Sequence, residues 1–356
     1  YYSVSIYFAE SIDKLSDNLK EVKPHVITAV PRLLEKVYDK IIAKGAELTG
    51  VKKKLFYWAL ELGQVYQPYG ENGWWYEAKL SLARKIIFSK WKEGLGGNIE
   101  LIVSGSAALQ PRLASVFAAA EIPVMEGYGL TETSPVIAVN DERNHNFRIG
   151  TVGKVIDEVE VKIAEDGEIL TKGPNLMMGY YKDKEKTDEA IDANGYFHTG
   201  DIGEFDADGF LKITDRKKEM FKTSGGKYVA PQIIENIMKQ SRFIEQIMVI
   251  GEGEKMPAAF IQPNFEFVED WAKRKHINIG KTNEELVKNE AVIKRIQEEV
   301  DFYNQKFGHW EQVKRFELTP EVWSIENDEL TPTMKLKRRN IKERNIDLYN
   351  KIYDRK

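Results

Sequence analysis

A strand–helix–strand pattern between residues 99 and 125 constrains the fold of this chain most strongly. Residues 99–103 form a short apolar run with branched side chains, which is typical of a buried strand. After a small-residue turn at 104–108, Pro111 begins a predicted helix that extends to about Ala120, and residues 122–125 give a second strand. Strands joined in this way are parallel, and such sheets bind ligands at the carboxyl ends of their strands. We therefore predict an α/β domain whose site follows these strands.

The pattern changes near residue 150. Short stretches of alternating apolar and polar residues surround Asp-Gly turns at 166–167 and 208–209, which predicts a small antiparallel β-barrel. A charged stretch at 217–219 is typical of a joint between domains, and an α+β pattern follows it. We predict the remainder of a large α/β domain over 1–145, a small β-barrel subdomain over 146–216 and a smaller α+β domain over 217–356.

Composition excludes several classes of function. Hydrophobic residues make up 42% of the 356 residues and charged residues 30%, as in soluble globular proteins. The net charge of -4 gives no electrostatic reason to expect nucleic acid as a partner. The chain has no cysteine, which excludes disulfides and thiolate chemistry and fits a reducing compartment. We expect a cytoplasmic protein, with peripheral contact at the inner face of a membrane left open. The run Trp74-Trp75-Tyr76 could line an acyl channel or touch a membrane, but we favour packing against the protein.

The octapeptide 126–133, Glu-Gly-Tyr-Gly-Leu-Thr-Glu-Thr, directly follows the second predicted strand. Its glycines allow backbone N–H groups to approach a ligand closely. Tyr128 offers a flat face to a base, Thr131 offers a hydroxyl to a phosphate, and Glu132 offers an oxygen ligand to Mg²⁺. The competing interpretation is an ordinary glycine loop with a surface carboxylate.

Three further segments carry polar groups at defined spacing. Residues 196–201 end in Thr-Gly-Asp, where Asp201 could accept hydrogen bonds from both hydroxyls of a ribose. Residues 214–227 form a basic hairpin, and residues 330–339 form a basic run around Lys335. Taken singly, these segments are typical of a turn and of solvated charged surfaces. A lysine inserted into a closed cleft would instead neutralise charge on a phosphoryl group that meets a carboxylate.

In their order and spacing, the four segments together resemble the adenylate-forming superfamily of acyl-CoA synthetases, luciferase-like enzymes and peptide-synthetase adenylation domains. The resemblance covers essentially the whole chain. Within the superfamily, Val30-Pro31-Arg32 and Leu330-Thr331-Pro332-Thr333 look most like long-chain fatty-acid–CoA ligases. The resemblance implies that ATP activates a fatty acid as acyl-AMP, that coenzyme A then accepts the acyl group, and that the third domain is a mobile lid.

The resemblance also assigns roles by position. It implies catalytic roles for Lys335, Thr131, Glu132 and Lys222, a Mg²⁺ ligand at Glu132 and a hinge at Lys218. AMP and ATP would contact Gly105, Ser106, Ala107, Glu126, Gly127, Tyr128, Gly129, Thr131, Asp201, Arg216 and Lys335. Coenzyme A would contact Ser224, Gly225 and Gly226.

Two features depart from the pattern of the superfamily. The Ser/Thr/Gly-rich loop ending in Pro-Lys-Gly, which grips the β- and γ-phosphates, does not occur in these residues, and residue 219, after the hinge, is glutamate. The chain opens at Tyr1 with a strand-like stretch to Phe8, which we interpret as a cut inside a domain, the alternative being a processed natural N-terminus. We therefore expect the isolated chain to be inactive and its full-length parent to be active. The alternatives are another acid–CoA ligase or adenylation domain, and a non-catalytic nucleotide-binding module.

Overall fold

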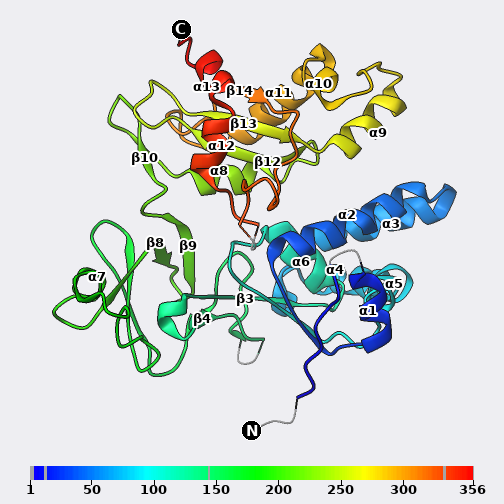
Figure 1. The fold of residues 1–356 in the computed structure, drawn as a ribbon. Coiled ribbons are helices and arrows are strands. Elements are labelled where there is room, and N and C mark those ends of the chain that lie inside the picture. The colour runs from blue at the N-terminus through cyan, green and yellow to red at the C-terminus, as the bar shows by residue number, and fades with distance from the viewer. Residues whose placement is uncertain (1–3, 12–13, 143–144, 332–333, 356) are drawn as a thin grey trace. The chain divides into compact units, whose positions relative to one another are not determined.

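The computed structural model describes residues 4–11, 14–142, 145–331 and 334–355 (Figure 1). They form two compact units. The first unit consists of the chain up to Ile163 together with 170–199 and 204–213. The second unit consists of 164–169, 200–203 and the chain from Thr214 onward. The predicted α/β class is confirmed, because parallel strands, crossover helices and further sheets are all present. The division into three domains stays a prediction.

A five-stranded sheet organises the first unit, in the order β1-β2-β3-β4-β5. The parallel pairing of β2 with β3 confirms the predicted crossover, β1 is also parallel to β2, and β4 and β5 continue the sheet antiparallel. Residues 4–8, the described part of the strand-like opening, form no strand and are exposed. The strands are β1 (Val26–Ala29), β2 (Leu101–Ser104), β3 (Val124–Gly129), β4 (Val136–Val139) and β5 (Lys154–Val155).

Helices of the first unit pack with this sheet around one apolar core. Pro31 and Pro111 each stand at the first turn of a helix, where a missing N–H costs nothing. The helical stretch from Trp74 to Gly94 runs as α4, a π-helical turn η2 and α5 in succession. The helices are α1 (Leu15–Val22), α2 (Pro31–Glu47), α3 (Gly50–Gln64), η1 (Pro68–Gly70), α4 (Trp74–Ala83), η2 (Arg84–Phe88), α5 (Ser89–Gly94), α6 (Pro111–Ala119) and η3 (Thr131–Thr133).

A four-stranded sheet follows, with the strands in sequence order β6-β7-β8-β9. Both predicted Asp-Gly turns are present, because Gly167 and Gly209 take left-handed φ values of +86° and +81° between consecutive strands. The elements are β6 (Glu160–Ile163), β7 (Glu168–Lys172), α7 (Lys184–Ala190), β8 (Phe197–Phe205) and β9 (Leu211–Arg216).

The second unit has an α+β architecture. A two-stranded hairpin, β10-β11, precedes a three-stranded sheet in the order β12-β13-β14, in which β12 is antiparallel and β14 parallel to β13. Apolar side chains from the helices and both faces of this sheet form its cores. The elements are β10 (Phe221–Lys222), β11 (Tyr228–Val229), α8 (Pro231–Met238), β12 (Ile244–Ile250), β13 (Ala258–Pro263), α9 (Phe265–Lys275), α10 (Asn283–Leu286), α11 (Glu290–Asn304), β14 (Arg315–Leu318), α12 (Arg338–Arg344) and α13 (Ile346–Ile352).

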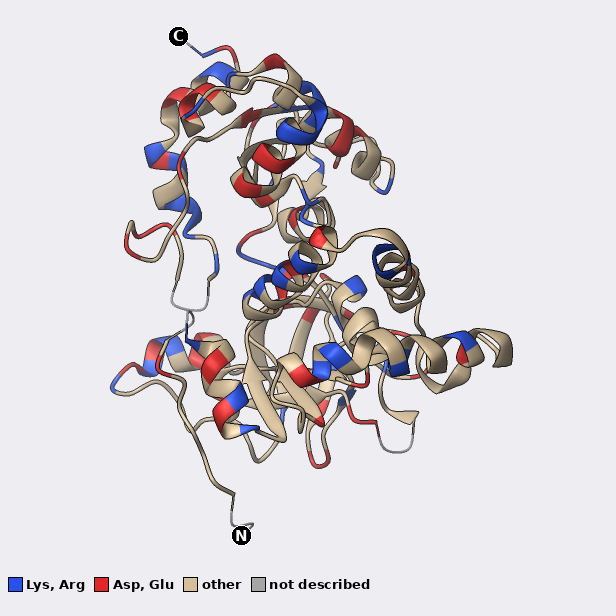
Figure 2. Ribbon diagram, turned by 90° about the vertical axis from the view of Figure 1, so that its right-hand side faces the viewer, with Lys and Arg blue, Asp and Glu red and all other residues tan. Residues whose placement is uncertain are grey.

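Figure 2 shows that basic and acidic residues are mixed along the helices, in keeping with the small net charge. Within the described ranges, no helix is both long and apolar enough to cross a membrane.

Candidate functional site

The octapeptide begins inside β3 and leaves it as a tightly built loop. Its first residue, Glu126, is fully buried, and the N–H of Leu109 donates a hydrogen bond to its Oε2 at 3.1 Å. Burial raises the pKa of the Glu126 carboxyl to about 8, despite that hydrogen bond. A side chain at Gly129 would place its Cβ 1.7 Å from the carbonyl oxygen of Pro135, so this position requires glycine.

The small-residue turn at 104–108 lies beside this loop. Ser104 pairs with Glu126 in the parallel register, so the turn and the loop leave neighbouring strands at the same level. A Cβ at Gly105 would lie 3.6 Å from the carbonyl oxygen of Gly127, which shows how close the two segments are. Ser106 takes a left-handed φ of +72° and is exposed. The structure therefore brings the residues predicted to contact adenine into one region.

Glu132 follows the loop in η3 and is oriented from two sides. The hydroxyl of Tyr180 donates to its Oε1 at 3.0 Å, and the N–H of Met177 donates to its carbonyl at 2.8 Å. In the part of the chain that the structure describes, no group of three or more acidic or histidine side chains could hold a metal by itself. A single carboxylate nevertheless suits Mg²⁺, which is commonly bound by one or two carboxylates together with substrate phosphates and water.

In the second unit, the Thr-Gly-Asp turn sets Asp201 against Arg216. Arg216 Nε lies 3.1 Å from Asp201 Oδ1, and the side chain of Asp201 is only 6% exposed. Gly200 has a left-handed φ of +70°, and its N–H donates to Glu168 Oε1 at 2.9 Å. The other carboxylate oxygen of Glu168 lies 2.8 Å from Lys217 Nζ. The buried Glu168 thus joins the turn to the segment that precedes the predicted hinge.

The backbone of Lys335 makes two hydrogen bonds with Thr331. The N–H of Thr331 donates to the carbonyl of Lys335 at 2.8 Å, and the N–H of Lys335 donates to the hydroxyl of Thr331 at 3.0 Å. Burial lowers the pKa of Lys335, Arg216 lowers it further, and Asp201 acts in the opposite direction. The structure therefore brings Lys335 into the electrostatic field of the Asp201–Arg216 pair. Pro332 and Thr333 of the same motif lie outside the described residues.

Arg338, three residues after Lys335, is bound by two carboxylates. Its Nε lies 3.0 Å from Glu219 Oε2, and one of its terminal nitrogens lies 2.7 Å from Glu235 Oε2. Glu235 is buried, and its Oε1 accepts a hydrogen bond from the N–H of Val249 in β12 at 2.7 Å. This network joins the Lys335 segment to α8, to β12 and to the residue after the predicted hinge.

The positions predicted for coenzyme A binding and for the hinge are exposed. Lys222 is in β10, and its Nζ lies 4.9 Å from the centroid of the Tyr228 ring. The hairpin tip at 224–226 is exposed, and Gly226 takes a left-handed φ of +77°. Lys218 is exposed between β9 and β10.

Sequence reasoning missed three residues that position the site: Glu168, Tyr180 and Arg338. Tyr180 and Glu168 are separated in sequence from the groups that they contact, so no local spacing indicates them. Arg338 belongs to the basic run at 330–339, where it resembles its solvated neighbours, and only its two carboxylate partners, the buried Glu235 and the half-buried Glu219, distinguish it.

Comparison with known protein families matches both parts of the chain. Residues 4–181 match the family model described as AMP-binding enzyme, and residues 219–355 match the AMP-binding enzyme C-terminal domain. The chain belongs to the AMP-binding enzyme family. The four segments identified in the sequence lie in these two regions and in the stretch that joins them.

Curated relatives of this member of the AMP-binding enzyme family carry specific names. The long-chain-fatty-acid–CoA ligase FadD15 of Mycobacterium bovis is 34% identical over 355 residues, which are 99% of this chain and 58% of the relative. The long-chain-fatty-acid–CoA ligase 5 of Rattus norvegicus is 36% identical over 347 residues, which are 93% of this chain and 49% of the relative. The chain therefore spans about half the length of the curated relatives that it matches.

Solved structures share the fold of this chain. The adenylation domain of a carboxylate reductase from Mycobacterium chelonae superposes with a TM-score of 0.68 at 21% identity, over 97% of this chain and 49% of that one. A carboxylic acid reductase didomain from Segniliparus rugosus, in complex with AMP, gives a TM-score of 0.70 at 20% identity, over 97% of this chain and 44% of that one. At these identities the likeness concerns the fold alone.

Proposed function

We propose that the full-length parent of this chain is a long-chain fatty-acid–CoA ligase. It would convert a fatty acid, ATP and coenzyme A to acyl-CoA, AMP and pyrophosphate. The observation that carries the proposal is the whole-chain identity of 34–36% to relatives named as long-chain-fatty-acid–CoA ligases. The loop at 126–132 and the Asp201–Arg216 pair supply groups suited to a nucleotide, which supports the same assignment.

The proposed reaction has two steps. The fatty-acid carboxylate attacks the α-phosphorus of ATP, and pyrophosphate leaves with the electron pair of the broken P–O bond. The thiol of coenzyme A then loses its proton and attacks the acyl carbonyl, and AMP leaves. The attacking groups belong to the substrates, so the protein contributes binding, orientation and charge neutralisation.

Each group of residues has a proposed task in this scheme. The backbone of the turn at 104–108 and of the loop at 127–131 would hold adenine and the α-phosphate, with Tyr128 stacked on the base. Asp201 would accept hydrogen bonds from the ribose hydroxyls, and Arg216 would hold that carboxylate in place. Lys222 and the hairpin tip at 224–226 would border coenzyme A in the second step.

Lys335 would place its ammonium group against the charge that develops in the first step. Its lowered pKa reflects an incompletely solvated ammonium, and the two hydrogen bonds with Thr331 fix its backbone. Glu132 would hold Mg²⁺, which would neutralise part of the phosphate charge when bound. Tyr180 would orient that carboxylate through the hydrogen bond to Oε1.

The test of this proposal compares two lysines of the same segment in the full-length parent. Lys335→Ala should slow acyl-adenylate formation by roughly a hundredfold or more, because it removes a preorganised charge contact. Thioester formation from supplied acyl-adenylate should change little. Lys337→Ala is the matched control, since Lys337 is ion-paired with Asp328 and lies outside the matched position.

Separate assays of pyrophosphate release and of acyl transfer measure the two steps. Equal effects of the two alanine variants on pyrophosphate release would contradict the role of Lys335. A panel of acids from acetate to long-chain and aryl acids tests the substrate class, and preference for an aryl acid would replace the fatty-acid assignment.

A further inference from the structure

Four large apolar side chains form an exposed stripe on the helix that runs through α4 and η2. Trp74 is 77% exposed, Trp75 61%, Leu82 53% and Ile86 37%. The spacing from Trp75 to Leu82 and Ile86 places them on one side of the helix. Leu80 and Ala83, on the opposite side, are completely buried in the core. Contrary to the packing favoured from the sequence, the two tryptophans do not pack into the core of the described residues.

Lysines are placed within and beside this stripe. Lys79 Nζ lies 5.8 Å from the centroid of the Trp75 ring, and Lys85 is exposed next to Ile86. We call the set Trp74, Trp75, Lys79, Leu82, Lys85 and Ile86 the Trp–Lys surface. A tryptophan with a neighbouring lysine suits a boundary between water and an apolar phase, because the ring is amphipathic and the lysine stem can extend its charge into water.

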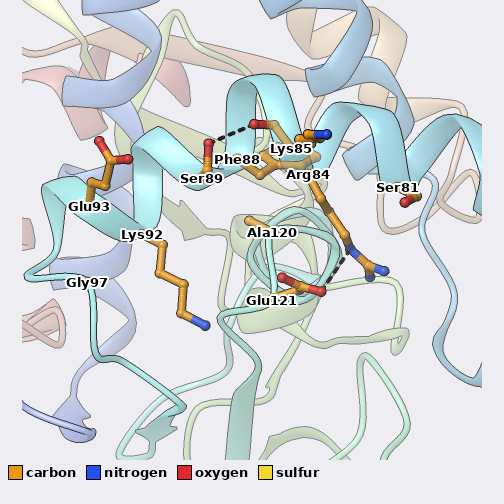
Figure 3. A pocket seen from close by; sticks show the side chains of 10 residues that line it. All are labelled: Ser81, Arg84, Lys85, Phe88, Ser89, Lys92, Glu93, Gly97, Ala120 and Glu121. Atoms are coloured by element: carbon orange, nitrogen blue, oxygen red, sulfur yellow. Dashed lines mark hydrogen bonds and ion pairs between the residues drawn. The ribbon is translucent and has the colours of Figure 1, made fainter.

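The next side of the same helix is polar and contains a pocket of about 500 Å³ (Figure 3). Arg84, Lys85 and Lys92 line it together with two acids, Glu93 and Glu121. Arg84 is already occupied, since its Nε donates to the carbonyl of Ala119 at 2.9 Å and lies 3.8 Å from Glu121 Oε1. Lys85 borders both the pocket and the stripe, so the polar flank of the Trp–Lys surface carries cations.

We propose that the Trp–Lys surface docks on the surface of an anionic lipid bilayer. Helices that lie in a bilayer interface combine Trp and Leu on one side with Lys or Arg beside them, which is the pattern found here. Anionic headgroups would attract Lys79 and Lys85 from a distance. A protein cover over the stripe would instead desolvate Lys79, which lies between Trp75 and Leu82 in the sequence. The charge of the surface therefore favours a lipid partner.

This proposal goes beyond the proposed function and is compatible with it. Long-chain fatty acids partition into bilayers, so docking would bring the protein to a reservoir of its proposed substrate. The docking rests on α4 and η2 alone and needs no ATP, coenzyme A or fatty acid. A negative result for vesicle binding would therefore not contradict the proposed reaction. Likewise, a negative result for acyl-CoA synthesis would not contradict the docking.

The experiment uses the full-length parent and vesicles of phosphatidylcholine with roughly one third phosphatidylglycerol, compared with pure phosphatidylcholine. Cosedimentation should show binding to the anionic vesicles that weakens as salt is added. The double variant Trp74→Ser/Trp75→Ser should lower the partition coefficient by roughly tenfold or more. Lys79→Glu/Lys85→Glu should give a similar loss on anionic vesicles only. Trp310→Ser is the matched control, because Trp310 is also exposed and also has a lysine, Lys227, over its ring.

A second measurement, of tryptophan fluorescence quenching, takes its main result from the unmodified parent and so does not depend on whether a variant folds. Brominated phosphatidylcholine in the vesicles should quench tryptophan fluorescence of the parent, and the quenching should fall in the Trp74/Trp75 variant but not in Trp310→Ser. Absence of quenching in the parent, or equal vesicle binding by all variants, would overturn the proposal. A lower melting temperature of the Trp74/Trp75 variant with unchanged vesicle binding would also overturn it, in favour of a cover supplied by another part of the parent chain.

Discussion

At the scale of single residues, the candidate site contains a buried carboxyl group. Glu126 is buried at the end of β3, and burial raises its pKa to about 8. In the unfolded chain its pKa would be about 4.5. Folding therefore takes up a proton at pH values between these limits, so this residue makes the protein less stable as the pH rises from about 4.5 to 8.

Glu126→Gln should remove this pH dependence, because the amide keeps an acceptor for the Leu109 N–H and never ionises. At pH 8.5 the variant should melt roughly 4–8 °C above the parent, and the difference should shrink toward zero near pH 5. Thermal melts of the full-length parent across this pH range measure the effect. Glu100→Gln, at an exposed carboxylate, is the control. A constant difference between Glu126→Gln and the parent at all pH values would contradict the assignment.

At the scale of elements, the ion network around Arg338 determines where the Lys335 segment lies. Arg338→Met would leave Glu235 buried without its cation, and breaking a buried pair in this way typically costs about 3 kcal/mol of stability. It should also slow adenylate formation more than thioester formation, because Lys335 loses its support. Arg339→Met is the matched control, since Arg339 is 88% exposed and pairs only along its helix with Glu343, a contact worth about 0.3–0.5 kcal/mol. Similar unfolding midpoints for the two variants would show that the network does not stabilise the segment.

The proposed hinge allows a second prediction at this scale. Proline fixes φ near −65°, so Lys218→Pro should hold the chain in one orientation and preserve either adenylate formation or thioester formation, but not both. The two steps are assayed separately in the full-length parent. Lys217→Pro is not a suitable control, because the N–H of Lys217 donates a hydrogen bond to the carbonyl of Gly200, which proline would remove. Lys212→Ala, at an exposed position of β9, serves instead. Near-normal rates of both steps in Lys218→Pro would remove Lys218 from the hinge role.

Elements with a strong local pattern could be predicted from the sequence, and those defined by distant partners could not. The two apolar runs and the helix-initiating Pro111 predicted β2, β3 and α6. Strand β14 has only four residues, Arg315–Leu318, and forms because β13 offers it a parallel edge. In the same way, the local residue pattern predicted the glycine loop at 126–129. Glu168 and Arg338 could not be identified, because their hydrogen-bond and ion-pair partners are far away in the sequence.

At the scale of the whole molecule, the chain corresponds to about half of its curated relatives. The 356 residues of this chain do not contain the Pro-Lys-Gly loop that binds the β- and γ-phosphates in the superfamily. We therefore expect the purified 356-residue chain to make little or no acyl-CoA, whereas the full-length parent should be active. Release of AMP from ATP, dependent on coenzyme A, measures the difference. Robust release by the chain alone would show that the missing loop is dispensable.

The parallel pairing of β13 with β14 has a consequence for the order in which the second unit assembles. The hairpin-like pair β12–β13 closes over a short turn, whereas β14 reaches β13 only after the entire run from Asn264 to Lys314 has been traversed. Closing so long a loop costs conformational entropy before the contacts between the two strands can form, so parallel pairs of distant strands form late in folding. Substitutions in β14 should therefore accelerate unfolding and leave the refolding rate nearly unchanged, while substitutions at the β12–β13 pair should slow refolding.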